Sequence, residues 1–173
     1  LVMLVGEDFF PTVDAGLMKL HVRAPTGTRI EHTELLVDDV ERSIRKIIPP
    51  DELEGMSDNI DVPISYDLAF YPTDNIGPQD AEILIQLKPD HRPTDLYERR
   101  IRQMMLTDYP NITGYFQAAD IVNQVLNFGL PAAIDVQISG NDLNSDYRIA
   151  SRLQAMMSNI PGVVDSRIAE PLD

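Results

Sequence analysis

The residue types that could carry out chemistry are few in this chain and far apart. Its three histidines, His21, His32 and His91, lack the one-turn spacing of a helical pair of metal ligands. The 173 residues include no cysteine, which excludes disulfides, thiolate zinc sites, iron–sulfur clusters and cysteine nucleophiles. The nucleophile-elbow, phosphate-loop and dinucleotide-binding motifs are missing from the sequence too. We therefore expect a protein that is not an enzyme and that needs no cofactor or metal.

The charge balance of the chain argues against nucleic acid as a binding partner. The chain has 14 Lys and Arg against 28 Asp and Glu, so its formal net charge is −14. Nucleic-acid binding relies on clustered basic side chains that neutralise phosphates, so this excess of acid argues against an RNA-binding domain. Hydrophobic residues make up 43% and charged residues 24%, as in ordinary globular proteins. No run of the sequence approaches the about 20 apolar residues that a membrane-spanning helix needs.

Two apolar segments could bind a ligand. The first, from Tyr66 to Asp80, holds several aromatic residues, among them Phe70 and Tyr71. Connections longer than about 12 residues are often functional, so these aromatics predict an apolar ligand surface or a partner contact. The alternative is a loop that only buries its own aromatic side chains. The second segment, 121–131, contains Phe128, and we expect it to line a junction between two parts of the chain.

The elements that position these residues follow a strand–helix–strand pattern that occurs three times. Proline or glycine breaks the pattern between elements, and Thr28 with Glu31 has the spacing of a capping box at the first helix. The strands are expected at 17–22, 59–65, 82–87, 112–117, 134–138 and 163–168. The apolar helix faces are expected to be Leu36, Val40, Ile44 and Ile47; then Tyr97, Ile101 and Met104 or Met105; then Leu143, Tyr147, Ala150, Leu153, Met157 and Ile160.

Two such units interleave into a four-stranded antiparallel sheet with both helices on one face, the ferredoxin-like split βαβ arrangement. We therefore expect an α+β fold with one complete subdomain over 13–119, a connector over 120–130 and half of a second subdomain over 131–173. Alone, the third unit would leave a sheet edge open and a helix face uncovered. Its other half is expected further along a longer protein; pairing with another copy of the chain is the alternative.

Four short motifs occur in an order that resembles a known family. The sequence Gly-Glu-Asp-Phe-Phe-Pro at 6–11 is similar to the one that follows the membrane helix opening the C-terminal half of resistance–nodulation–division (RND) permeases. Residues 20–28, 129–140 and 160–165 are similar to the turn, the subdomain entry and the helix end of their porter region. The chain thus resembles the periplasmic porter region, C-terminal half, of an RND multidrug efflux permease of the hydrophobe/amphiphile efflux type.

The resemblance implies a fragment of a proton-driven transporter. Residues 1–12 would be the end of a transmembrane helix and a membrane-interface segment, and 13–119 the first porter subdomain. The parent would be a homotrimer in the inner membrane, with this region in the periplasm, and it would work with a periplasmic adaptor and an outer-membrane channel. Its proton-relay carboxylates would lie in membrane helices outside this region, so the fragment is not expected to transport alone.

The resemblance also implies a substrate path for drugs or other amphiphilic compounds. The segment from Tyr66 takes the place of a flexible loop that gates this path in the family. The residues implied for the path are Tyr66, Phe70, Tyr71, Leu84, Tyr115, Gln117 and Phe128. Pumps of the heavy-metal branch carry thioether ligands, whereas Leu20, Asp80 and Val125 stand at those places here, which disfavours metal export. The alternative function is a stand-alone ferredoxin-like module that binds a small ligand or regulates another protein.

Overall fold

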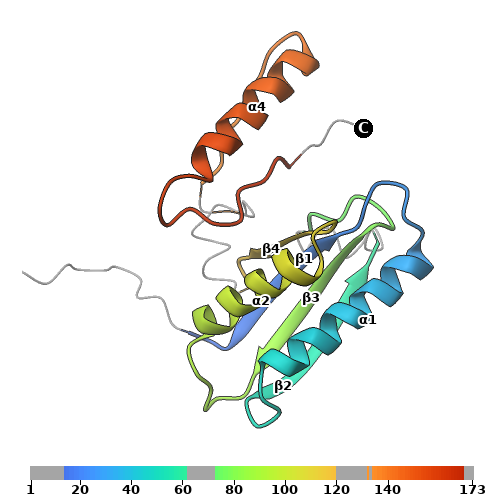
Figure 1. Ribbon diagram of the computed structural model, residues 1–173, viewed down its shortest axis with the longest axis vertical. Helices are drawn as coiled ribbons and strands as arrows, with labels where there is room; N and C mark the ends of the chain where they lie inside the picture. Colours follow the sequence, from blue (N-terminus) through green and yellow to red (C-terminus); the bar gives the residue numbers. More distant parts are fainter. Residues whose placement is uncertain (1–13, 62–72, 120–131, 133, 170–173) are drawn as a thin grey trace, which may run out of the picture.

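The computed structural model describes residues 14–61, 73–119, 132 and 134–169 (Figure 1). Its elements follow in the order β1 (Leu17–Arg23), α1 (Ile30–Ile47), β2 (Leu53–Ile60), β3 (Asp80–Leu87), α2 (Thr94–Asp108), β4 (Thr113–Gln117) and α4 (Leu143–Met157). Among these residues, none of the helices has the length and the apolar character that crossing a membrane requires. The expected membrane-interface segment, 1–12, lies outside the described residues.

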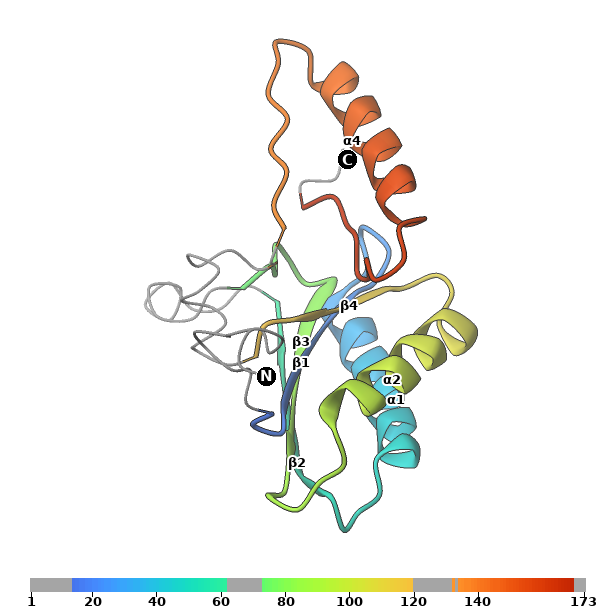
Figure 2. The same cartoon turned by 90° about the vertical axis from the view of Figure 1, so that its left-hand side faces the viewer.

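The sheet interleaves the first two units as the repeats predict. Its four strands stand in the order β2-β3-β1-β4, and each neighbouring pair is antiparallel. Helices α1 and α2 cover the same face of the sheet, and no helix of the described residues lies on the other face, which we call the helix-free face (Figure 2). This is the ferredoxin-like split βαβ arrangement, so the expected α+β fold is confirmed.

Strand alternation decides which side chains meet the helices. Met18, Leu20 and Val22 of β1 are almost fully buried in the core, while the residues between them point to the helix-free face. Burying a side chain of this size stabilises the fold by roughly 1.5–3 kcal/mol. The other core residues of the sheet and the helices are Ala81, Ile83, Ile85, Leu87, Phe116, Val37, Val40, Ile44, Ile48, Tyr97, Ile101, Met104 and Met105.

The expected capping box at α1 is wrong. The helix begins at Ile30, and its N-cap residue, Arg29, makes no side-chain capping bond. The hydroxyl of Thr28 instead donates to the carbonyl oxygen of Pro25 at 2.6 Å and closes the preceding turn. Thr28 therefore lies one residue too early to reach the free amides of the first helical turn.

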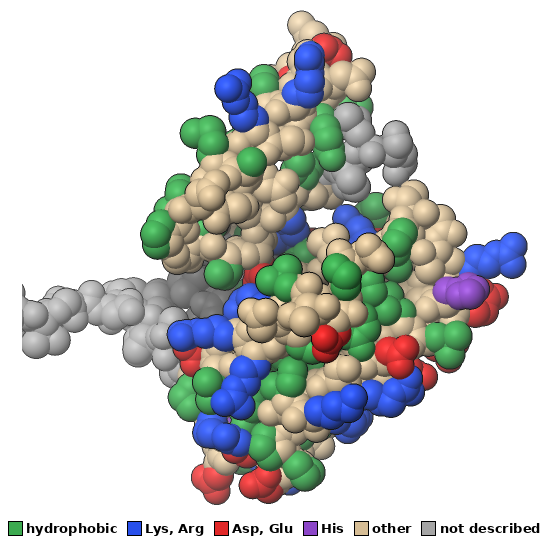
Figure 3. Space-filling model, in the orientation of Figure 1, with side chains coloured by type: hydrophobic (Ala, Val, Ile, Leu, Met, Phe, Trp, Pro, Cys, Tyr) green, Lys and Arg blue, Asp and Glu red, His purple; other side chains and the backbone are tan. Residues whose placement is uncertain are grey.

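The buried face of α1 also differs slightly from the expectation. It runs through Thr33, Val37, Val40 and Ile44, and the predicted Leu36 and Ile47 are only partly buried at its margins. The outward side of both helices carries charged residues, and Figure 3 shows Lys and Arg side chains gathered there. Three of these arginines pair with acids one turn away, in the pairs Arg42–Asp39, Arg45–Glu41 and Arg99–Asp95. Because these pairs are exposed to water, each contributes little to the stability of the fold.

Strand β2 lies several residues before its expected position at 59–65. It pairs with β3 from Leu53, opposite Leu87, to Ile60, opposite Ala81. Its side chains are half-buried or exposed, so an apolar alternation is weak there, and pairing with β3 defines the strand instead. Asp61 follows with a φ of 72°, in the left-handed region, and ends the strand.

The third unit keeps its helix but not its strands. The α4 helix forms as predicted, and the Asp142 side chain caps it by accepting from the backbone N–H of Asn144 at 3.2 Å. No α4 residue is fully buried; on the expected face Tyr147, Ala150, Leu153 and Met157 are half-buried, and Leu143 and Ile160 are exposed. The described residues of 134–138 and 163–168 are not strands, contrary to the prediction. A strand needs a hydrogen-bonded neighbour, and the described part of the chain offers them none.

Candidate functional site

The helix-free face of the sheet carries buried ionisable side chains. Lys19 and His21 of β1 and Asp80 and Glu82 of β3 are each at most 4% exposed, and Tyr115 of β4 is 3% exposed. Charged groups are rarely buried to this extent unless they pair with one another, because transfer out of water disfavours the charge. The buried polar network on the helix-free face is therefore the candidate functional site of this fold.

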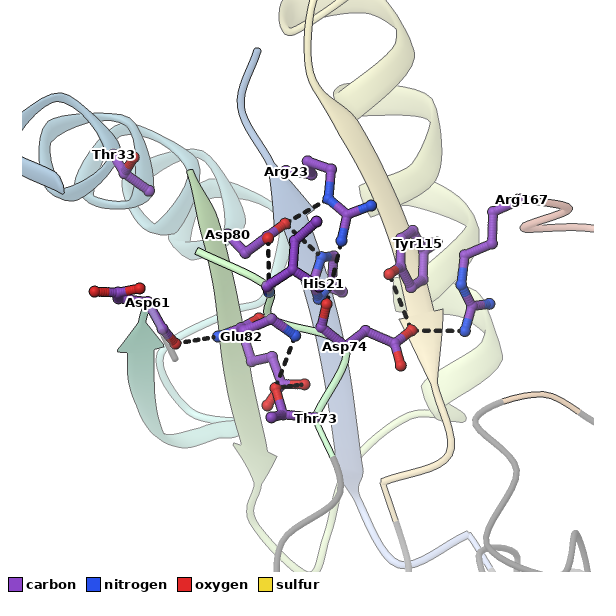
Figure 4. A network of polar contacts seen from close by, with 12 residues as sticks. His21, Arg23, Thr33, Asp61, Thr73, Asp74, Asp80, Glu82, Tyr115 and Arg167 are labelled. Carbon is purple, nitrogen blue, oxygen red and sulfur yellow. Dashed lines mark hydrogen bonds and ion pairs between the residues drawn. The ribbon is translucent and has the colours of Figure 1, made fainter. Parts of the chain in front are cut away.

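Asp80 is the centre of the first half of this network. One of its carboxylate oxygens, Oδ1, accepts from Arg23 Nε at 2.5 Å and from His21 Nε2 at 3.2 Å. The other, Oδ2, accepts from the backbone N–H of Ile76 at 3.0 Å. Figure 4 shows Asp80 beside His21 and Arg23. Burial alone would raise the pKa of Asp80, but the hydrogen bonds from His21 and Arg23 outweigh it and hold the pKa below its ordinary value. Asp80 is therefore an anion that balances the charge of Arg23.

Asp74 is the centre of the second half. It lies on the loop 73–79, which leads into β3, and its Oδ2 accepts from the Tyr115 hydroxyl at 3.0 Å and from Arg167 Nη2 at 2.8 Å. Its backbone oxygen accepts from Arg23 Nη2 at 3.1 Å. Burial would raise the pKa of Asp74, but the charge and hydrogen bond of Arg167 lower it overall. One carboxylate thus joins the loop, β4 and the C-terminal part of the third unit.

Three side chains stack beside these carboxylates. The Arg167 guanidinium lies 4.1 Å from the centre of the Tyr115 ring, a cation–π contact. The Tyr115 ring stacks in turn on His21, with 4.6 Å between ring centres and 19° between ring planes. Burial and the charge of Asp74 raise the pKa of Tyr115, so its hydroxyl stays protonated and donates to Asp74.

The face also holds polar atoms without partners. Glu82 pairs through Oε1 with Lys19 at 3.1 Å and with the Thr73 hydroxyl at 2.9 Å, but its Oε2 has no hydrogen bond. Within the described ranges, the buried side-chain atoms without a hydrogen-bond partner are His21 Nδ1, Asn75 Oδ1, Glu82 Oε2, Gln117 Oε1 and Arg167 Nε. Buried polar groups normally bond to protein or water, so these atoms could bond to a polar ligand group. Among the described residues, no group of three or more His, Cys, Asp or Glu is placed to hold a metal ion.

The structure brings three of the expected substrate-path residues to this face. Leu84 and Gln117 lie opposite Lys19 on its two sides, in the β1–β3 and β1–β4 registers. Tyr115 lies opposite His21 in the register of β1 with β4. The other four expected residues, Tyr66, Phe70, Tyr71 and Phe128, lie outside the described residues. The role of all seven in a substrate path stays a prediction.

A second polar cluster joins α2 and β4 to the third unit. Asp165 accepts from Arg102 Nη2 at 2.8 Å and Nε at 3.0 Å, and from the backbone N–H of Phe116 at 3.2 Å. Arg102 also pairs with Glu98 at 3.1 Å. Burial is the largest cause that raises the pKa of Glu98, and the charge of Asp165 adds to it. The backbone at Asp165 has a φ of 56°, a left-handed conformation that Asp tolerates better than most residues.

Of the network residues, Tyr115 was predicted from the sequence as a site residue, but the charged side chains around it were not. Lys19, His21 and Arg23 occupy alternate positions of β1, and Asp80 and Glu82 alternate positions of β3, so complementary charge on one face of paired strands was a usable signal. No comparable signal marks Arg167, which lies 93 residues from Asp74 in the sequence.

Comparison with known proteins adds one finding. No protein-family model matches the chain, and no curated protein matches it. Among solved structures, it is similar to a crystal structure of a heavy metal efflux pump, with a TM-score of 0.71 and 20% identity over 92% of this chain. The two share a fold. At this identity the likeness establishes the fold alone, and the chain spans 16% of the length of the pump chain.

The match agrees with the expected family resemblance in the fold. A segment of an efflux pump has the α+β architecture described above, as the resemblance implied. The matched pump is a heavy metal pump, whereas the resemblance pointed to the hydrophobe/amphiphile type. The fold likeness does not support that finer assignment, and the type of substrate has to be argued from the residues.

Proposed function

We propose that this chain is the periplasmic substrate-conduit and gating portion of a proton-driven RND-type efflux transporter. The observation that carries the proposal is the fold shared with an efflux pump over 92% of the chain. The four ordered motifs support it independently, because the fold likeness does not depend on them. The parent protein would be a homotrimer in the inner membrane, with an adaptor and an outer-membrane channel as partners.

The helix-free face would be one wall of the conduit. It combines an aromatic ring, Tyr115, and an aliphatic side chain, Leu84, with the polar groups of Lys19 and Gln117, a mixture that suits an amphiphile. No covalent step is required; apolar contact and hydrogen bonds to the unpartnered atoms would hold the substrate. Tyr115 is buried in this structure, so substrate would reach it only after the surrounding segments have moved.

The methionines favour amphiphiles over soft metal ions as substrates. Soft ions such as Cu(I) prefer thiolate and thioether ligands, and the chain contains no cysteine. Met18, Met104 and Met105 are buried in the core beneath the helices, and Met56 packs against that core. Of the positions matched to thioether ligands, Leu20 lies in the core and Asp80 is bonded to Arg23 and His21, while Val125 lies outside the described residues.

A resistance assay tests the proposal. The complete reading frame that contains this chain would be expressed in cells lacking their own pumps, and growth would be measured with amphiphilic dyes, with cationic detergents and with copper or silver salts. We expect resistance to the amphiphiles and its loss in Leu84→Arg, which places a charge beside Lys19. Leu35→Arg, at an exposed position of α1, is the matched control. Resistance to the metal salts alone would overturn the amphiphile assignment, and no resistance to anything would overturn the transport proposal.

A further inference from the structure

Residues 163–168 cross the edge of the sheet and contact both of its sides. On the helix side, Asp165 binds Arg102 of α2 and the backbone N–H of Phe116 on edge strand β4. On the helix-free side, Arg167 binds Asp74 and covers the Tyr115 ring. Figure 2 shows this segment passing between α4 and the sheet.

The segment is also tied to α4. Gln154 of α4 donates from Nε2 to the backbone oxygen of Ser166 at 2.8 Å, and Ser166 lies between the two residues that contact the sheet. A displacement of α4 would therefore be transmitted to Asp165 and Arg167 through one hydrogen bond and two peptide units.

The loop 73–79 receives the contact from Arg167. Three of its residues bond to the sheet: the Thr73 hydroxyl to Glu82, the Asn75 side chain to the backbone oxygen of Asn59, and the Ile76 amide to Asp80. Asp74 differs from these, because its side chain reaches Tyr115 and the third unit (Figure 4). The loop is thus attached to the sheet at all four of these residues, and through Asp74 it is attached to the third unit as well.

Loss of the Arg167 contact would leave the Asp74 carboxylate poorly compensated. Its side chain is 22% exposed, so water replaces a missing guanidinium only in part. The neighbouring cation is Arg23, whose Nη2 already bonds to the Asp74 backbone oxygen while its Nε is held by Asp80. Asp74 would then turn toward Arg23 or toward solvent, and either change displaces the loop that carries it.

From these contacts we infer that Arg167 is a positioning residue that couples the third unit to the loop 73–79. While residues 163–168 stay against β4, Arg167 holds Asp74 beside Tyr115. When they move away, the loop loses this attachment and is held less firmly on the helix-free face, by its bonds from Thr73, Asn75 and Ile76. Its part in transport rests on the proposed function, in which this face is the conduit wall. The coupling itself belongs to the fold and is reciprocal, so loosening the loop must also loosen the third unit.

Hydrogen exchange of the 173-residue chain tests the coupling in the first direction. In Arg167→Gln, we expect the amides of Asn75 and Ile76 to exchange roughly tenfold faster or more, because local opening of the loop becomes easier. Arg167→Lys keeps the charge but loses the planar stack and the fork of N–H donors. Its loop amides should therefore exchange at a rate between those of the unchanged chain and of Arg167→Gln. Arg152→Gln, which changes an exposed arginine on α4, is the matched control. Core amides of β3 serve as the internal reference for folding.

The reciprocal variant tests the second direction. Asp74→Asn removes the charge that holds Arg167, and we expect faster exchange in residues 163–168 and in the last turns of α4. Asp38→Asn, at an exposed position of α1, is the control. Arg102→Gln separates the two anchors: it should speed exchange at Phe116 more than at Asn75 and Ile76. Unchanged loop exchange in Arg167→Gln, or unchanged exchange of the third unit in Asp74→Asn, would overturn the coupling.

A transport measurement then separates the coupling from its proposed use. In the complete protein, Arg167→Gln should slow export of amphiphilic dyes while Arg152→Gln does not. Altered exchange with unaltered export would overturn the role of this coupling in transport and leave the structural coupling standing. Absence of export in the unchanged protein would overturn the proposed function, which the exchange experiment does not use.

Discussion

Asp14 caps helix α2 from a position 80 residues earlier in the chain: its Oδ2 accepts a hydrogen bond from the backbone N–H of Thr94 at 2.8 Å. The second oxygen of Asp14 accepts from the amide of Gly16 at 3.1 Å. Partial burial would raise the pKa of Asp14, but the backbone hydrogen bonds from Thr94 and Gly16 lower it overall. A single carboxylate thus fixes the start of β1 to the start of α2, although the residue directly before the helix, Pro93, offers no side-chain cap.

Replacing this remote cap should destabilise the fold. We expect Asp14→Ala to lower the free energy of unfolding by about 1 kcal/mol, as for loss of an ordinary N-cap. Asp14→Asn keeps an acceptor oxygen and should cost less. Urea denaturation followed by circular dichroism measures both, and Asp90→Ala, at an exposed position before α2, is the control. Equal stabilities for Asp14→Ala and the control would show that the cap contributes nothing.

Gly16 and Gly27 offer a comparison of backbone and contact effects. Both have positive φ, 69° and 85°, so a Cβ is strained at either place. At Gly16 it would also lie 2.9 Å from His91 Nε2 and 3.3 Å from Leu87 Cβ, whereas at Gly27 nothing lies within 4 Å. We expect Gly27→Ala to cost about 1 kcal/mol from the backbone alone and Gly16→Ala to cost at least about 1 kcal/mol more from the contact. Urea denaturation measures the free energy of unfolding of both variants. An equal loss of stability in the two would contradict the expected contact effect and would mean that His91 moves away from the added Cβ.

Glu52 should make stability depend on pH in the acid range. Its carboxylate accepts from the backbone N–H of Arg92 at 2.8 Å and from the Tyr97 hydroxyl at 2.5 Å. The Arg92 backbone bond, then the Tyr97 bond, lower the pKa of Glu52 from 4.5 to about 2. Because the folded pKa lies below the unfolded one, the stabilisation is fully present above pH 4.5 and is lost as the pH falls toward 2.

The Glu52→Gln variant checks this pH dependence. Its unfolding free energy should fall less steeply than that of the unchanged chain between pH 4.5 and about 2, because the group that titrates there is gone. Glu54→Gln, at an exposed position two residues later, should keep the original slope. Thermal unfolding in a series of buffers across this range gives the slopes. A Glu52→Gln slope equal to that of the unchanged chain would contradict the assignment.

Local sequence patterns predict most of the strands and helices of the sheet subdomain. They do not show which strands pair, because paired strands are far apart in the sequence. Alternating apolar residues in Leu17–Val22 and Glu82–Leu87 were enough to predict β1, β3 and their buried faces, because burial of one face sets a period of two. The edge strand β2 was placed too late because its apolar side chains, Leu53, Met56 and Ile60, do not alternate regularly. The bulge between Leu53 and Gly55 makes this pattern irregular.

The candidate site was predictable only in part, for a related reason. Leu84, Tyr115 and Gln117 were expected to belong to a substrate path, and strand alternation places all three on the helix-free face. Which charges meet there depends on register: Arg23 lies opposite Asp80, and His21 opposite Glu82. Arg167 reaches Asp74 through the path of residues 163–168 across β4, which has no sequence period to reveal it.

Photoaffinity labelling of the complete transporter by an amphiphilic substrate analogue tests the conduit most directly. Peptides would be mapped by mass spectrometry, with excess unlabelled substrate as competitor. We predict competable labelling of the helix-free face, in the peptides that contain Leu84, Tyr115 and Gln117, and its reduction in Leu84→Arg. Labelling confined to the outer surfaces of α1 and α2, or labelling that the substrate does not displace, would contradict the account.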